Sequence, residues 1–265
     1  MKPEFTTIAN AKKQTGLSYL GGCNVSQKII KSQKVDAILT YCIYLAPANT
    51  SGYNVCPSAT NECKKGCLAT SGRARIELQG GIDMIHDCRI KKTKLFFEQQ
   101  DFFMCWLVAE LQMYQRKAIK KNLGFAVRLN GTSDIDYVNV RLNGNNIFEL
   151  FPDIQFYDYT KVITKLNNIP SNYNLTLSYT GRNTNECINH LTNGGNVAMI
   201  FNTKVLPKTW KGFNVINADI SDSRFKDTKG SIAGLKWKYI ADKQLDTEIR
   251  NGIFCIQDND KNCEW

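Results

Sequence analysis

The chain has 265 residues, and its 34 lysines and arginines against 24 aspartates and glutamates give a formal net charge of +10. Hydrophobic residues make up 43% of it, enough for one sizeable core, and no run approaches the ~18 apolar residues of a membrane span. This composition excludes a hydrophobic transmembrane helix and favours a polyanionic partner, because basic groups neutralise phosphates and release their counterions. We therefore expect that the protein does not bind a membrane. We also expect that its basic charge either binds a nucleotide or nucleic acid or forms a solvated surface.

The first residues carry no secretion signal, because residues 1–7 contain no apolar stretch of the kind that a signal peptide needs. We therefore expect a cytoplasmic protein with reduced thiols. The chain has ten cysteines. In a reducing compartment, clustered cysteines act as metal ligands or catalysts more often than they form disulfides.

The first predicted strand leads into a cysteine-rich loop. Residues 1–34 are polar and basic, and we treat them as an N-terminal extension of a single domain at 35–265. A β-branched and aromatic run at 37–45 predicts a strand. The loop at 51–73 follows it.

Helical spacing dominates the next segment, and alternating short elements fill the remainder. Apolar residues recur at helical spacing from 82 to 121, with a break near 99–100 after which Asp101 can cap a second helix. Beyond Gly124 the pattern predicts strands separated by turns, with helices at 147–151 and 184–191. The predicted strands are 125–129, 154–159, 173–178, 196–201, 213–217 and 231–237.

Strands that alternate with helices and short loops are typical of a parallel sheet with right-handed crossovers. We therefore predict an α/β fold, a TIM-like barrel that is complete or incomplete, with a Rossmann-like open sheet as the alternative. The glycine motifs of dinucleotide-binding and P-loop proteins are both missing from the sequence, which favours the barrel.

Three closely spaced cysteines give the sharpest chemical signal in the chain. Cys56, Cys63 and Cys67 follow the spacing C-x6-C-x3-C within a loop. Three thiolates held this close can ligate one iron–sulfur cluster and leave one iron open to an exchangeable molecule. The alternative is a zinc site, which needs a fourth ligand from His86, His190, Cys23 or Cys88.

Polar residues follow each predicted strand, where the chemistry of a parallel α/β barrel is found. Arg128 lies inside its strand, and a buried arginine must be paired or must bind an anion. The candidate ligand-binding residues are Arg128, Asn130, Ser133, Ser178, Asp222, Arg224 and Lys236. The candidate proton-transfer or catalytic groups are Asp134, Asp158 and Lys161.

The sequence resembles the phage-encoded gene product 88 family from about residue 40 to 238. The resemblance rests on the motifs Tyr44-Leu-Ala-Pro-Ala, Val55-Cys-Pro with Cys63 and Cys67, Ser71-Gly72-Arg73, Arg128-Leu-Asn-Gly-Thr-Ser-Asp134, Phe151-Pro-Asp, Phe156-Tyr-Asp-Tyr-Thr-Lys161, Asp222-Ser-Arg-Phe and Gly234-Leu-Lys236. It implies a relationship to the radical S-adenosylmethionine barrel enzymes, although their usual cysteine spacing is C-x3-C-x2-C. It also implies a phage-encoded protein in the host cell cytoplasm.

These observations lead to one main hypothesis and two alternatives. The main hypothesis is an enzyme whose [4Fe–4S] cluster on the three cysteines receives an electron from a reductant and binds S-adenosylmethionine at its open iron. Its substrate would be a nucleotide or nucleic acid, in keeping with the basic charge. The alternatives are a zinc-stabilised binding protein and a metal-free basic protein that binds nucleic acid or a host protein.

Overall fold

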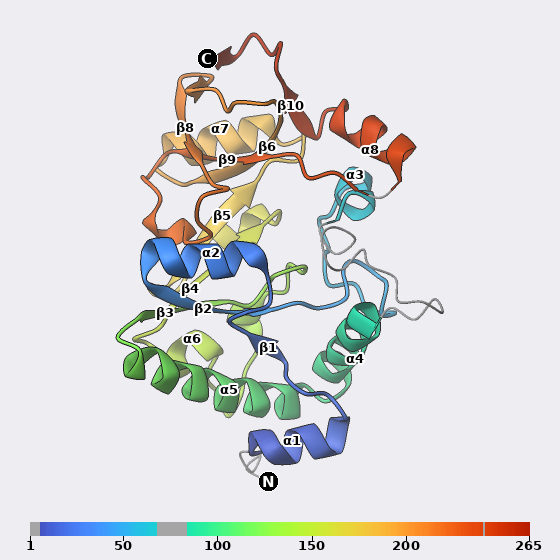
Figure 1. Ribbon diagram of the computed structural model, residues 1–265, viewed down its shortest axis with the longest axis vertical. Coiled ribbons are helices and arrows are strands. Elements are labelled where there is room, and N and C mark those ends of the chain that lie inside the picture. The colour runs from blue at the N-terminus through green and yellow to red at the C-terminus, as the bar shows by residue number, and fades with distance from the viewer. Residues whose placement is uncertain (1–5, 68–83, 241) are drawn as a thin grey trace.

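A mostly parallel sheet runs through the protein in the computed structural model, which describes residues 6–67, 84–240 and 242–265 (Figure 1). Among these residues the sheet has eleven strands, and the order along it is β1-β2-β3-β4-β5-β6-β9-β8-β7-β11, with β10 paired to β6. The strands are β1 (Gly21–Gly22), β2 (Ile38–Ile43), β3 (Gly124–Arg128), β4 (Gln155–Thr160), β5 (Tyr173–Ser178), β6 (Val197–Asn202), β7 (Thr209–Trp210), β8 (Phe213–Asn217), β9 (Ile232–Lys236), β10 (Cys255–Gln257) and β11 (Cys263–Glu264).

The pairing confirms the predicted α/β class. All neighbours from β2 to β8 along the sheet pair in parallel, while β1, β7 and β11 add antiparallel pairs. The seven strands predicted from the sequence correspond to β2, β3, β4, β5, β6, β8 and β9.

The described helices surround this sheet. They are α1 (Ile8–Thr15), α2 (Gln27–Asp36), α3 (Asn61–Lys65), α4 (Met84–Glu98), α5 (Gln100–Lys120), α6 (Ile147–Leu150), α7 (Thr184–Thr192) and α8 (Lys243–Arg250). The predicted break near 99–100 is confirmed, but Gln99 is the residue before α5 and Asp101 lies inside its first turn. None of the described helices is both long and apolar enough to cross a bilayer.

The largest core cluster lies between α5 and the first strands. Phe103, Trp106 and Leu107 of α5 are fully buried against β2, β3 and β4. Side chains alternate between the two faces of a strand. Val127 therefore enters this core, whereas Arg128 points to the other face of β3.

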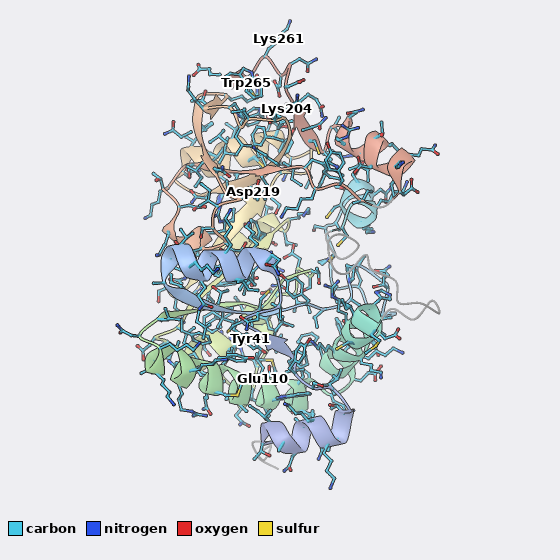
Figure 2. All side chains as sticks on the ribbon, viewed as in Figure 1. Tyr41, Glu110, Lys204, Asp219, Lys261 and Trp265 are labelled. Atoms are coloured by element: carbon cyan, nitrogen blue, oxygen red, sulfur yellow. The ribbon has the colours of Figure 1, made fainter. Side chains whose placement is uncertain are left out.

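The N-terminal segment, to which the sequence assigned no element, joins this architecture through a buried carboxylate. Glu110 of α5 accepts hydrogen bonds from the backbone N–H groups of Leu20 and Gly21 at 3.0 and 3.1 Å, and from the Tyr41 hydroxyl at 2.5 Å. Figure 2 shows Tyr41 and Glu110 close together beside α5. Gly21 in β1 pairs with Ile43 in β2. Residues 6–36 are therefore part of the packed structure.

The sheet is open in the described part of the chain, since its path ends at β1 and β11, and no closed TIM-like barrel is shown. Helix α2 lies across the front of the sheet in Figure 1. It contacts the β8–β9 connection through a hydrogen bond from Asp222 N to Ser32 Oγ of 2.6 Å and one from Ser223 Oγ to Asp36 of 2.8 Å. These bonds join the connection between two late strands to the helix that precedes β2.

Candidate functional site

A cavity of about 1630 Å³ opens beside the carboxyl ends of the parallel strands. In parallel α/β folds this end of the sheet is the usual place for a ligand. Eleven of the thirteen predicted site residues line this cavity: Cys56, Cys63, Cys67, Arg128, Asn130, Ser133, Asp134, Lys161, Ser178, Asp222 and Lys236. The other two, Asp158 and Arg224, are buried in the protein.

The three cysteines lie on and around the short helix α3. Thr60 caps α3 by accepting a hydrogen bond from the Cys63 backbone N–H at 3.2 Å, and Cys67 follows the end of the helix. Cys63 also packs against the apolar cluster of Ile240 and Ile249, which connects α3 to the α8 region. Residues 68–73 of the predicted loop, including Ser71, Gly72 and Arg73, lie outside the described residues.

The thiols are half-buried, and burial raises the pKa of Cys56, as does the neighbouring Cys63. The Cys56 Sγ donates to the carbonyl oxygen of Thr132 at 3.7 Å. Within residues 6–67, 84–240 and 242–265, no three Cys, His, Asp or Glu side chains stand ready as a metal site. The cysteines therefore share a cavity without being arranged as a complete ligand set.

A buried carboxylate organises the loop that follows β3. Asp158 accepts hydrogen bonds from the Asn130 N–H at 2.8 Å and from the Tyr173 hydroxyl at 3.0 Å. Asn130 Oδ1 in turn accepts from the Ser133 hydroxyl at 2.7 Å and from the Ile135 N–H at 2.9 Å. Burial raises the pKa of Asp158 to about 7, although the Arg128 charge and these donors oppose the shift. Asp158, Asn130 and Ser133 thus fix the shape of the loop.

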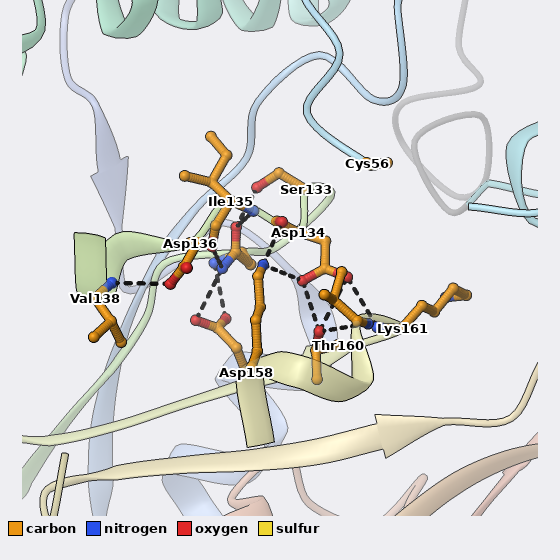
Figure 3. Close-up of polar contacts among 12 residues, drawn as sticks. Cys56, Ser133, Asp134, Ile135, Asp136, Val138, Asp158, Thr160 and Lys161 are labelled. Atoms are coloured by element: carbon orange, nitrogen blue, oxygen red, sulfur yellow. Dashed lines mark hydrogen bonds and ion pairs between the residues drawn. The ribbon is translucent and has the colours of Figure 1, made fainter. Parts of the chain in front are cut away.

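Asp134 is held by several donors at once (Figure 3). Its carboxylate accepts from Thr160 Oγ1 at 2.9 Å, from the Lys161 N–H at 2.9 Å and from Lys165 Nζ at 2.7 Å. The Lys161 side chain points away from these contacts in Figure 3 and lines the cavity. Sequence reasoning missed Lys165, which lies in the 3₁₀ helix η4 (Ile163–Leu166) and has no motif of its own.

The same loop supports the cysteine segment directly. The Asp134 N–H donates to Val55 O at 2.7 Å, next to Cys56. Thr132 Oγ1 donates to Leu45 O at 2.6 Å, where the chain leaves β2. Two strand-end segments far apart in the sequence are therefore joined around Cys56.

Gly131 is required at the closest point of this contact. A Cβ atom there would lie 2.5 Å from Ile43 O and 2.9 Å from the Tyr44 ring. We expect Gly131→Ala to cost about 1–3 kcal/mol in the free energy of unfolding, because the loop must shift away from β2. Urea denaturation measures this, with Gly22→Ala as the control, since a Cβ at Gly22 meets nothing closer than 3.4 Å. Equal costs for the two variants would contradict the close approach.

An ion network lies on the face of the sheet opposite α5. Asp222 contacts Arg128 Nη1 at 3.1 Å and Lys28 Nζ at 3.1 Å, and accepts from the Tyr157 hydroxyl at 2.9 Å. Burial alone would raise the pKa of Asp222, but Arg128 and Lys28 hold it well below its usual range. The guanidinium of Arg128 also lies over the Tyr159 ring, 4.8 Å from its centroid. The sequence predicted that Arg128 is paired or binds an anion, with Asp134, Asp158 and Asp222 as available partners, and it gave no sign of Lys28.

The remaining predicted ligands have structural contacts. Arg224 is 2% exposed, and its guanidinium contacts Ser221 O at 2.5 Å and Asp227 at 3.1 Å, within the β8–β9 connection. Lys236 lies at the end of β9 and donates from Nζ to Lys204 O at 2.6 Å. Ser178 ends β5 at the cavity wall. The lining therefore combines thiols, lysines and Arg128 at the ends of four parallel strands.

The fold and cavity define an α/β protein with an open, mostly parallel sheet and a polar site at its strand ends. The family model described as "Gene product 88" matches residues 6–253, and the chain belongs to this family. This confirms the resemblance to the gene product 88 family noted from the sequence, while the relationship to the radical S-adenosylmethionine enzymes stays a prediction. No curated protein and no solved structure matches the chain.

Proposed function

We propose that this protein is an iron–sulfur enzyme that acts on a nucleotide or nucleic acid. Cys56, Cys63 and Cys67 would hold a [4Fe–4S] cluster at the rim of the cavity, and the substrate would lie beside it. The observation that supports this is that all three cysteines line the same cavity as the polar ends of the parallel strands.

The residues fit such a cluster in number and in type. Three thiolates leave one iron without a protein ligand, and a cluster of this kind transfers one electron from an external reductant. S-adenosylmethionine is the co-substrate that we propose for the open iron. Burial raises the pKa of the Cys56 thiol, whereas a bound metal cation would favour its thiolate.

The other residues divide into two groups by their contacts. Asp134, Asp158, Asn130 and Ser133 hold the loop that contacts the cysteine segment, which makes them positioning residues. Arg128, Lys161, Lys236 and Ser178 line the cavity, where they would bind the anionic or polar groups of a substrate.

The test is anaerobic purification followed by measurement of iron, sulfide and zinc. We expect about four irons and four sulfides per chain after reconstitution. Single changes of Cys56, Cys63 or Cys67 to serine should remove most of both. Cys263→Ser is the matched control, because Cys263 lies in β11, away from the cavity lining.

Two outcomes would overturn the proposal. One is stoichiometric zinc without iron, which would favour the zinc-stabilised alternative. The other is a loss of iron in Cys263→Ser as large as in the three cavity variants. Retained nucleic-acid binding in a chain without any metal would instead favour the basic binding protein.

A further inference from the structure

We propose that the substrate is a single-stranded nucleic acid, which lies in the cavity between the end of α5 and the cysteine rim. This inference rests on the proposed function and names the substrate class of the same site. It is carried by the length, the charge and the aromatic lining of the cavity.

The cavity is long as well as large. Its lining extends from Lys117 near the end of α5 to Tyr44 just after β2, Cys56 beyond it and Trp237 after β9. A volume of about 1630 Å³ also exceeds the roughly 300–1,000 Å³ of an ordinary small-molecule pocket. The space therefore suits a polymer segment better than one nucleotide.

The lining is strongly basic. Ten lysines and arginines and three aspartates are among its described residues. Two of the aspartates are already engaged, Asp222 by Arg128 and Lys28, and Asp134 by Lys165. In the described part of the chain no salt bridge involves Lys117 or Lys121, which lie at the end of α5. These cations are available to phosphates far along the cavity from the cysteines.

Exposed aromatic rings line the same cavity. Tyr19 is 47% exposed, and Lys92 Nζ lies 4.3 Å from its ring centroid. Tyr239 is 67% exposed, with the Arg250 guanidinium 5.7 Å from its ring centroid. Single-stranded nucleic acids bind to grooves that combine backbone-tracking cations with rings on which bases stack. A duplex would keep its bases stacked on one another and would gain nothing from these rings.

The aromatic segment after β9 brings such a strand to the cysteines. A Cβ atom on Gly66, next to Cys67, would lie 3.1 Å from the Trp237 ring. Trp237 therefore lies beside α3, and it lines the cavity together with Lys238 and Tyr239, which follow it in the chain. A base stacked on Tyr239 would be held near the proposed cluster, while the backbone continues toward α5.

The experiment measures binding of fluorescent single strands of about 12 nucleotides, as deoxythymidine and uridine oligomers, by anisotropy over a range of salt. Lys117→Ala/Lys121→Ala should weaken binding about tenfold at low salt. It should also reduce the slope of log K against log salt by about 1.4, since each lost phosphate contact is worth about 0.7. Tyr19→Leu and Tyr239→Leu should each weaken binding about fivefold and leave the slope unchanged.

The matched control is Lys12→Ala/Lys13→Ala, which removes the same charge from the last turn of α1, outside the cavity lining. Its binding should change less than twofold. The inference is overturned if this control weakens binding as much as the α5 variant. It is also overturned if thymidine monophosphate or a duplex of equal length binds as tightly as the single strand.

Iron measured in the same preparation separates the two proposals. Iron-loaded protein without cavity-dependent binding overturns only the inference about the substrate. Cavity-dependent binding by a chain that cannot be loaded with iron overturns the iron–sulfur function and leaves the cavity as a binding site for single strands.

Discussion

Asp222→Ala is expected to lower the free energy of unfolding by about 3–5 kcal/mol. The carboxylate is 1% exposed and serves two cations, Lys28 and Arg128, at 3.1 Å each. Their side chains are only 20% and 13% exposed, so water cannot fully replace the lost anion. Removing one partner of a buried ion pair destabilises a protein far more than the pair stabilises it, because the remaining charge is buried without compensation.

Guanidinium denaturation measures this loss, and Arg141→Ala provides the control. Arg141 and Glu149 form a pair of 2.8 Å with both side chains about half exposed, so we expect that change to cost less than about 1 kcal/mol. Adding Lys28→Met to Asp222→Ala should recover part of the loss, because one uncompensated cation is removed. A midpoint for Asp222→Ala equal to that of Arg141→Ala would contradict a buried network.

The strands with the clearest sequence signal are short apolar runs. The side chains of β2 and β6 are mostly buried, so the local pattern carries the signal. β1 has only two glycines, and Gly21 is held by Glu110, which is 89 positions away in the sequence. α2 buries only Ile29 and Ser32, so it lacks a clear apolar stripe. Elements stabilised by distant polar contacts leave no periodicity to read.

Part of the candidate site could be predicted from the sequence, because some of its polar residues stand at the ends of the predicted strands. Lys161 and Lys236 were found because polar residues at the ends of parallel strands face a common edge. The cysteines were found from their close spacing, and Arg128 because a buried arginine needs a partner. Lys28 and Lys165 were missed, since each is recognised only through its contact with an aspartate on another element.

The alternation of side chains along β4 predicts the position of Asp158 better than its place near the strand end does. Phe156 lies in the core cluster with α5, and a residue two positions later in a strand shares its face. Asp158 therefore points to that side, whereas Tyr157 points to Asp222 on the other. Position at a strand end predicted a cavity residue, but the alternation along β4 places this carboxylate behind the cavity wall.

The buried position of Asp158 leads to an expected pH dependence of stability. Burial raises its pKa from an ordinary 3.8 to about 7. The folded protein therefore binds this proton more tightly than the unfolded chain does, and the contribution of the group to stability falls as the pH rises from about 4 to about 7. Asp158→Asn removes the ionisation, while its amide oxygen can still accept from the Asn130 N–H.

We therefore expect the stability of Asp158→Asn relative to the unmodified protein to rise, by on the order of a few kcal/mol, between about pH 5 and about pH 8. Urea denaturation of both proteins at the two pH values measures this change. Asp258→Asn, which alters an exposed carboxylate, is the control for the loss of one aspartate. If Asp158→Asn keeps a constant difference from the unmodified protein, Asp158 is ionised in the folded protein as readily as in the unfolded chain, and its charge must be compensated by Arg128 and the donors of the loop.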